Sequence, residues 1–189
     1  MAELTIDTTK TALVVIDLQK GVTVQPTRPY PVQDVIGNAA LLAGAFRKRR
    51  MPVFLVHVAQ TEGTSLNVIS DESFVRSGPL PPDWSEFVPG IGPEQSDIII
   101  TKRQWGAFYG TDLELQLRRR GMNTIVLCGI STDFGVESTA RFAYEYGFQQ
   151  VFAADAMASR TDEQHNAAVR FIFPRMGRVR TTREILAAL

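Results

Sequence analysis

Residues 123–147 read NTIVLCGISTDFGVESTARFAYEYG and carry the clearest fold signal of the chain. The apolar, β-branched start predicts a strand, the middle predicts a sharp turn, and the end predicts a helix over 134–146 that stops at Gly147. Turns of this kind often present a nucleophile at the mouth of an α/β sheet. Gly135 stands at the tightest part of the turn and has no side chain, while Cys128 lies earlier, inside the apolar run. The stretch therefore predicts an α/β fold and leaves open which group does the chemistry.

The same alternation of short β-branched runs and longer helical patterns continues along the whole chain. Further strands are expected at 11–17, 53–59, 97–102, 150–155 and 178–182, and further helices at 33–50, 111–121, 162–171 and 182–189. Because strands that alternate with helices form parallel βαβ units, we expect a Rossmann-like, three-layer α/β/α sandwich with a mainly parallel six-stranded sheet. The length of 189 residues suits a single domain over 1–189. In the helix at 111–121, Thr111 and Glu114 predict a capping box and Gly121 predicts the end.

The composition excludes several classes of protein. A hydrophobic fraction of 44%, a charged fraction of 21% and a formal net charge of zero give no indication of a nucleic-acid partner. No apolar run approaches the roughly 20 residues of a membrane helix, so no membrane partner is indicated either. The single cysteine cannot form an internal disulfide, which fits a reducing compartment. A cytoplasmic protein is the expectation.

The segment 60–96 is long for a loop in a compact domain. Phe74, Trp84 and Phe87 give it apolar side chains with which to bury itself. We therefore expect an ordered lid or a subunit-contact segment there, and no second domain.

Two charged residues come at the ends of predicted strands. Ligands of parallel α/β sheets bind beyond the carboxyl ends of the strands, where Asp17 and Lys102 are expected. Burial raises the pKa of a carboxyl group unless a cation offsets the effect, and Lys102 could be that cation. An acid and an ammonium group that meet in a cleft can transfer protons and stabilise developing negative charge. The alternative is that Asp17 only caps backbone amides and Lys102 is a surface charge.

Other candidate residues favour structural roles. His57 lies within a predicted strand and His165 within a helical pattern, and neither has a partner at the spacing of a metal site, so we expect no metal. Cys128 is expected to be a small core residue. The glycines show neither dinucleotide-binding nor Walker spacing, so no cofactor is expected. Trp105 and Phe108 could wall a pocket for a planar substrate or could pack in the core.

These residues fall within segments that resemble the isochorismatase-like hydrolases, a superfamily that also contains nicotinamidases and N-carbamoyl-amide hydrolases. The matching segments are TALVVIDLQ (11–19), VHVAQ (56–60), KRQWGAFYGTDL (102–113) and VLCGISTDFGVESTARFAYEYGF (126–148). The resemblance covers essentially the whole chain and is closest to a functionally undefined bacterial branch. It implies a Rossmann-like sandwich that assembles as a homo-oligomer, a dimer or a tetramer, around a site for a small molecule.

The resemblance also implies roles for individual residues. Most members use an Asp–Lys–Cys triad, in which Asp17 and Lys102 match the first two residues and Gly135 falls at the place of the cysteine. Members often have a cis peptide at the position of Ile130–Ser131, which helps aim backbone amides at a substrate oxygen. The substrate-binding residues that we predict are Gln60, Trp105, Phe108, Ser131, Thr132 and Phe134.

Glycine at position 135 changes the expected reaction. True isochorismatases also have glycine at this place, and they hydrolyse a vinyl ether and release pyruvate without a covalent enzyme intermediate. Such a reaction needs an acid, for which Asp17 is the candidate, and no thiol. Characterised isochorismatases carry an aromatic hydroxyl residue where this chain has Ser131, so the substrate stays open. Two alternatives remain: an inactive metabolite-binding or scaffold protein, and an amide hydrolase in which Asp17 activates water.

Overall fold

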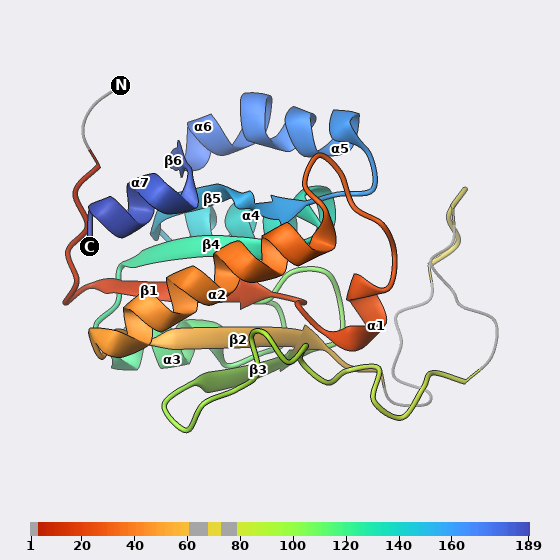
Figure 1. The fold of residues 1–189 in the computed structure, drawn as a ribbon, viewed down its shortest axis with the longest axis horizontal. Coiled ribbons are helices and arrows are strands. Elements are labelled where there is room, and N and C mark those ends of the chain that lie inside the picture. The colour runs from red at the N-terminus through yellow and green to blue at the C-terminus, as the bar shows by residue number, and fades with distance from the viewer. Residues whose placement is uncertain (1–3, 61–67, 73–78) are drawn as a thin grey trace.

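Six strands form one parallel sheet in the part of the chain that this computed structural model describes, residues 4–60, 68–72 and 79–189 (Figure 1). The strands are β1 (Thr11–Ile16), β2 (Val53–Val58), β3 (Ile98–Lys102), β4 (Thr124–Ile130), β5 (Gln149–Ala158) and β6 (Arg178–Arg180). Their order across the sheet is β3-β2-β1-β4-β5-β6, and every neighbouring pair is parallel. The predicted α/β class with a parallel six-stranded sheet is confirmed.

Helices cover both faces of this sheet, as the alternating pattern predicted (Figure 1). The helices are α1 (Lys20–Thr23), α2 (Val32–Lys48), α3 (Leu113–Arg119), α4 (Glu137–Glu145), α5 (Asp162–Ala167), α6 (Phe173–Met176) and α7 (Thr182–Ala187), with π-helical turns η1 (Thr132–Val136) and η2 (Ala168–Ile172). Buried residues of α2 and α7 share one core with the sheet, and buried residues of α3, α4 and α6 share the other. None of the described helices is long and apolar enough to span a membrane.

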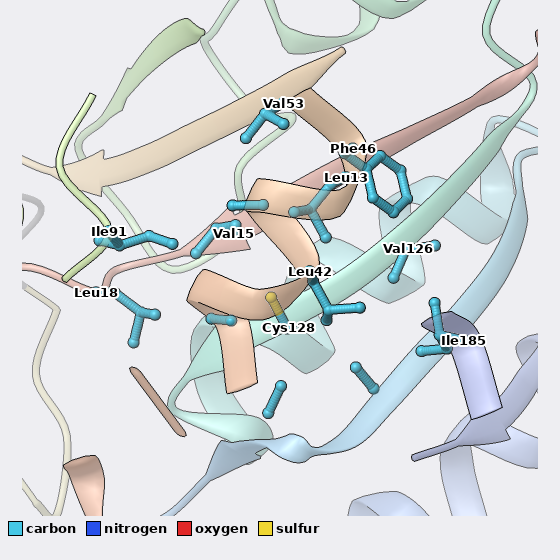
Figure 2. Packing of buried hydrophobic residues seen from close by; sticks show 14 of the residues in the cluster. Leu13, Val15, Leu18, Leu42, Phe46, Val53, Ile91, Val126, Cys128 and Ile185 are labelled. Atoms are coloured by element: carbon cyan, nitrogen blue, oxygen red, sulfur yellow. The ribbon is translucent and has the colours of Figure 1, made fainter. Parts of the chain in front are cut away.

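Alternation along the central strands explains why they are apolar throughout. In β1, Leu13 and Val15 belong to the core under α2, while Val14 and Ile16 belong to the core under α3 and α4. Figure 2 shows the first of these cores, in which Phe46 of α2 lies among side chains from several strands. A strand that is buried on both faces has no polar side to present.

The capping box predicted for Thr111 and Glu114 is wrong. Helix α3 begins at Leu113, its N-cap Asp112 makes no side-chain cap bond, and the Thr111 hydroxyl accepts from Leu113 N at 3.2 Å. The Thr111 hydroxyl donates to the carbonyl oxygen of Ala107 at 2.5 Å, within the preceding loop. Glu114 faces Arg118 one turn later, with 3.5 Å between the charged atoms. The predicted helix end at Gly121 is present, with a φ of 68° that favours glycine.

Strand β5 is longer than the sequence predicted, since it continues from Gln149 to Ala158. The extra residues pair with the end of β4 after a shift in register between Leu127 and Gly129. Gly129 lies at this shift with a φ of 118°, and a Cβ atom there would stand 2.0 Å from the carbonyl oxygen of Ile16. The close approach of β4 to β1 therefore requires glycine at this position.

Residues 79–96 of the long segment are tied to the carboxyl ends of β1 and β2. The Gln19 side chain is fully buried: its amide nitrogen donates to the carbonyl oxygens of Val58 and Trp84, and its oxygen accepts from Val58 N. His57 contacts the Ser85 carbonyl oxygen through Nδ1 at 2.7 Å and stacks on Phe87. Phe74 lies outside the described residues. The role of this segment as a lid stays a prediction.

Candidate active site

Asp17 and Lys102 meet beyond the carboxyl ends of the strands. Asp17 follows β1 and Lys102 ends β3, and β2 lies between those strands. The long lysine side chain spans that gap, so that Nζ lies 2.7 Å from Asp17 Oδ2. Only 8% of the Asp17 side chain and 1% of the Lys102 side chain are exposed. The carboxyl ends of the parallel strands therefore bring an acid and an ammonium group together where little water can reach them.

The surroundings of Asp17 favour its protonated form more than water does. Burial raises the pKa of the Asp17 carboxyl, and the charge and hydrogen bond of Lys102, followed by the charge of His57, oppose that rise. Among the described residues, no group hydrogen-bonds to the buried Oδ1 atom of Asp17. Lys102 therefore holds one of the two carboxyl oxygens of Asp17.

The backbone of Asp17 is also unusual. Its φ is 51°, in the left-handed region that non-glycine residues rarely adopt. Such conformations cost about 1–3 kcal/mol and cluster at functional sites. The Asp17 amide nitrogen donates to the Val56 carbonyl oxygen at 2.9 Å, which holds the residue at the end of the sheet.

Gly135 lies directly beside the Asp17–Lys102 pair. It is buried in the π-helical turn η1, which leads into α4. A Cβ atom built on Gly135 would stand 3.2 Å from Asp17 Oδ2 and 3.4 Å from Lys102 Nζ. The same atom would lie 2.9 Å from the Cγ2 methyl of Ile16, which is closer than real Cβ atoms approach. The turn after β4 therefore brings backbone, and no side chain, up to the charged pair.

Serine and aspartate side chains fix the turn that precedes Gly135. The Ile130–Ser131 peptide is cis, at the position that the resemblance implied. The hydroxyl groups of Ser131 and Ser159 both donate to Asp133 Oδ1, the latter at 2.7 Å. Ser159 directly follows β5, so this contact connects the turn to the neighbouring strand.

A buried histidine supports the same turn from α5. Thr132 Oγ1 and His165 Nδ1 are 2.9 Å apart, and both side chains are buried. Burial lowers the pKa of His165, and the charges of Asp162 and Asp133 oppose this. The sequence pattern had predicted a structural role for His165, but its contact with Thr132 had no signal in the sequence.

The aromatic residues predicted to bind substrate separate into two environments. Trp105 is 53% exposed and its ring meets the Phe134 ring edge-on, with 4.8 Å between the centroids. Phe108 is buried and packs near the rings of Tyr146 and Phe148. The structure therefore places Trp105 and Phe134 together near Gly135, and it places Phe108 in the core, which was the alternative.

The remaining candidate residues are Gln60 and Cys128. Gln60 is exposed, two residues after the end of β2. Cys128 is buried under α2, and burial together with the charge of Asp155 raises the pKa of its thiol to about 12 (Figure 2). A thiol with that pKa is a poor nucleophile near neutral pH. Over the described ranges, no three His, Cys, Asp or Glu side chains form a group that could hold a metal ion.

Sequence reasoning missed Thr139 of α4, whose side chain connects the loop after β3 to the turn after β4. Its hydroxyl donates to the Gly135 carbonyl oxygen at 2.7 Å and accepts from Ala107 N at 3.0 Å. A threonine on a helix gives no signal in a sequence, because only the fold brings the loop after β3 against it.

This fold agrees with comparisons to known proteins. Residues 11–184 match the model of the isochorismatase domain, and the chain belongs to the isochorismatase family. The uncharacterized isochorismatase family protein YwoC of Bacillus subtilis is 52% identical, over 98% of this chain and 97% of its own. The structure of an isochorismatase family protein from Burkholderia thailandensis has a TM-score of 0.94 at 44% identity and covers 100% of this chain and 99% of its own. A probable isochorismatase of Pseudomonas chlororaphis is 26% identical, over 98% of this chain and 89% of its own.

Proposed function

We propose that this protein hydrolyses the vinyl ether of a small carboxylated molecule, with Asp17 as the acid and without a covalent enzyme intermediate. The observation that carries the proposal is the buried Asp17–Lys102 pair, in which Asp17 Oδ2 lies 3.2 Å from the Cβ position of Gly135 and Oδ1 has no hydrogen bond among the described residues. Burial raises the pKa of the Asp17 carboxyl group, as a proton donor requires. The family is one of hydrolases, and one relative is a probable isochorismatase, which supports this substrate class.

The reaction begins with proton transfer from Asp17 to the terminal alkene carbon of the vinyl ether. The carbon–carbon π electrons form the new C–H bond, and the ether oxygen shares the positive charge of the resulting oxocarbenium ion. Water then adds to the oxocarbenium carbon and gives up a proton to the Asp17 carboxylate, which restores the protonated acid. The hemiketal then breaks its bond to the leaving oxygen, which takes the proton of the hemiketal hydroxyl group, so that a ketone and an alcohol are released. With isochorismate as substrate, the ketone is pyruvate.

Lys102 has a donor for the substrate in this scheme. An ammonium group has three N–H donors, and within the described residues Lys102 gives two of them to Asp17 Oδ2 and the Trp105 carbonyl oxygen. The remaining donor and the positive charge suit a substrate carboxylate. Trp105 and Phe134 would then lie along an apolar part of the substrate.

A mechanism with an enzyme nucleophile has less support. In the proposal Gly135 takes the place of the family's cysteine, and its missing side chain leaves room for substrate or water next to Asp17. Cys128 cannot substitute, because it is packed in the core under α2 with a thiol pKa of about 12.

The test is release of pyruvate from isochorismate by the purified protein and three variants. Asp17→Asn keeps the shape of the side chain and removes the acid, so we expect kcat to fall by about 10²–10⁴-fold. Lys102→Met should also lower activity, mainly by raising KM. Cys128→Ala is the matched control and should retain activity, since the thiol takes no part.

Two results would contradict the proposal. Activity of Asp17→Asn within a few-fold of the unmodified protein would remove the acid role. Loss of activity in a folded Cys128→Ala protein would favour a thiol mechanism. If the unmodified protein binds isochorismate without releasing pyruvate, and leaves other vinyl ethers and amides unchanged, the binding-protein alternative takes the place of this one.

A further inference from the structure

Hydrogen bonds and a short stretch of backbone connect the charged pair to Gly135. Asp17 Oδ2 binds Lys102 Nζ at 2.7 Å, and Lys102 Nζ donates to the Trp105 carbonyl oxygen at 2.5 Å. Two residues after Trp105, the Ala107 amide donates to Thr139, and the Thr139 hydroxyl donates to the Gly135 carbonyl oxygen. Gly135 lies next to Asp17, since a Cβ atom built on it would stand 3.2 Å from Asp17 Oδ2.

Thr139 is the point at which the two loops of the site are joined. Its hydroxyl has one proton, which goes to the Gly135 carbonyl oxygen, and it accepts the Ala107 amide with a lone pair. Both Thr139 and Ala107 are fully buried, so water does not replace these bonds at low cost. Through this hydroxyl group, the loop that supplies the acceptor of Lys102 is hydrogen-bonded to the turn that carries Gly135.

We propose that Thr139 is a positioning residue, whose hydroxyl sets where Lys102 stands relative to Asp17 and the backbone of Gly135. The inference deepens the proposed function, because the same Asp17–Lys102 pair would carry out the hydrolysis. Thr139 lies one helical turn after Gly135, and its hydroxyl acts through the Ala107 amide and the Trp105 carbonyl.

Removing the hydroxyl should loosen the acceptor of Lys102. Thr139→Val keeps the branched shape and leaves the Ala107 amide and the Gly135 carbonyl without that partner. The loop around Trp105 can then shift, and Lys102 loses its fixed place against Asp17. Because Lys102 lowers the pKa of Asp17, a more distant ammonium group lets that pKa rise. Displacements of about 1 Å can lower catalysis by up to 10²-fold, so kcat/KM should fall by about ten- to a hundredfold.

The test measures the pKa of Asp17 by carbon-13 NMR of its carboxyl group, assigned from the spectrum of Asp17→Asn. This readout does not depend on turnover, so it remains informative if the proposed reaction is wrong. The groups that act on this pKa are Lys102, His57 and the backbone of Val58, and Lys102 is the one that donates to the Trp105 carbonyl oxygen. We expect Thr139→Val to raise the pKa, and Thr139→Ser, which restores the hydroxyl, to return it to the original value.

Thr182→Val is the matched control. Thr182 is also a buried threonine whose hydroxyl is bonded, in its case to Asp155 Oδ1 at 2.8 Å, and it belongs to α7. This variant should lose stability and leave the pKa of Asp17 unchanged.

Two outcomes would overturn the inference: an unchanged pKa in folded Thr139→Val, or an equal rise in Thr139→Val and Thr139→Ser. If Thr139→Val does not fold, Thr139→Ala carries the same comparison, because it also removes the hydroxyl. If the unmodified protein hydrolyses the vinyl ether but Thr139→Val leaves the pKa of Asp17 unchanged, only the positioning role is overturned. If Thr139→Val raises the pKa of Asp17 but the unmodified protein shows no turnover, only the proposed reaction is overturned.

Discussion

Substituting Gly135 by alanine adds one methyl group at the centre of the site. That methyl carbon would stand 2.9 Å from Ile16 Cγ2, 3.2 Å from Asp17 Oδ2 and 3.4 Å from Lys102 Nζ. Ile16 is fully buried and branched at Cβ, so its methyl has little freedom to move aside. The strand, the charged pair or the turn must therefore shift.

Two effects of opposite sign decide the stability of Gly135→Ala. Overpacking a filled core costs about 1–3 kcal/mol. Replacing glycine by alanine within a helical segment gains about 1 kcal/mol. We therefore expect the free energy of unfolding to fall by about 1 kcal/mol, which corresponds to a Tm lower by about 2–4 °C for a domain of this size. Activity should fall more steeply, since the methyl occupies the space that we assign to substrate or water.

Urea unfolding and thermal denaturation measure this change, and Gly44→Ala is the matched control. Gly44 is an exposed residue within α2, and a Cβ atom there would meet nothing within 4 Å. Gly44→Ala should raise the free energy of unfolding by about 0.4–1 kcal/mol. Ile16→Ala removes the clashing methyl, so Gly135→Ala should cost less in that background. If Gly135→Ala stabilised the unmodified protein as much as Gly44→Ala does, the close packing around position 135 would be refuted.

Two further substitutions test the same geometry. Gly135→Cys should create a thiol that reacts with iodoacetamide near neutral pH, because Lys102 lies 3.4 Å from the Cβ position and lowers a thiol pKa; reactivity no greater than that of buried Cys128 would contradict the arrangement. Gly129→Ala should give no folded protein by circular dichroism, since its Cβ would stand 2.0 Å from the Ile16 carbonyl oxygen. Gly147 also has a positive φ, of 75°, but a Cβ atom there would meet nothing within 4 Å, so Gly147→Ala should lower the free energy of unfolding by only about 1–2 kcal/mol. Equal loss of folding in the two variants would show that the lack of space at Gly129 does not matter.

The sheet could be predicted from the sequence because its strands are short, apolar and separated by helical patterns. Burial on both faces left no polar alternation in β1 or β4, and that pattern is specific for a parallel sheet between helices. The capping box at Thr111 could not be excluded, since its hydroxyl is drawn to the Ala107 carbonyl oxygen by a loop whose path the sequence does not give. The full length of β5 depends on a register shift beside Gly129, which is likewise a property of the packed sheet.

The residues of the site that follow directly on strands could be predicted from the sequence. Asp17 and Lys102 follow from the rule that ligands bind beyond the carboxyl ends of parallel strands. The contacts of Thr139 and Gln19 could not be predicted, because each connects segments that are distant along the chain and gives no local pattern. For Phe108, sequence spacing could not decide between pocket and core, and packing near Phe148 decided it.

The most direct measurement of the central claim, that Asp17 acts as an acid, is the pH dependence of kcat/KM for vinyl ether hydrolysis. An acid must carry its proton, so the rate should be level at low pH and fall as the pH rises through the pKa of Asp17. Because burial raises that pKa, the fall should lie above the usual aspartate value of about 3.9. Lys102→Met removes the charge that lowers the pKa, and it should move the fall to higher pH. A rate that increases with pH over this range would contradict the account, since it would make Asp17 a base.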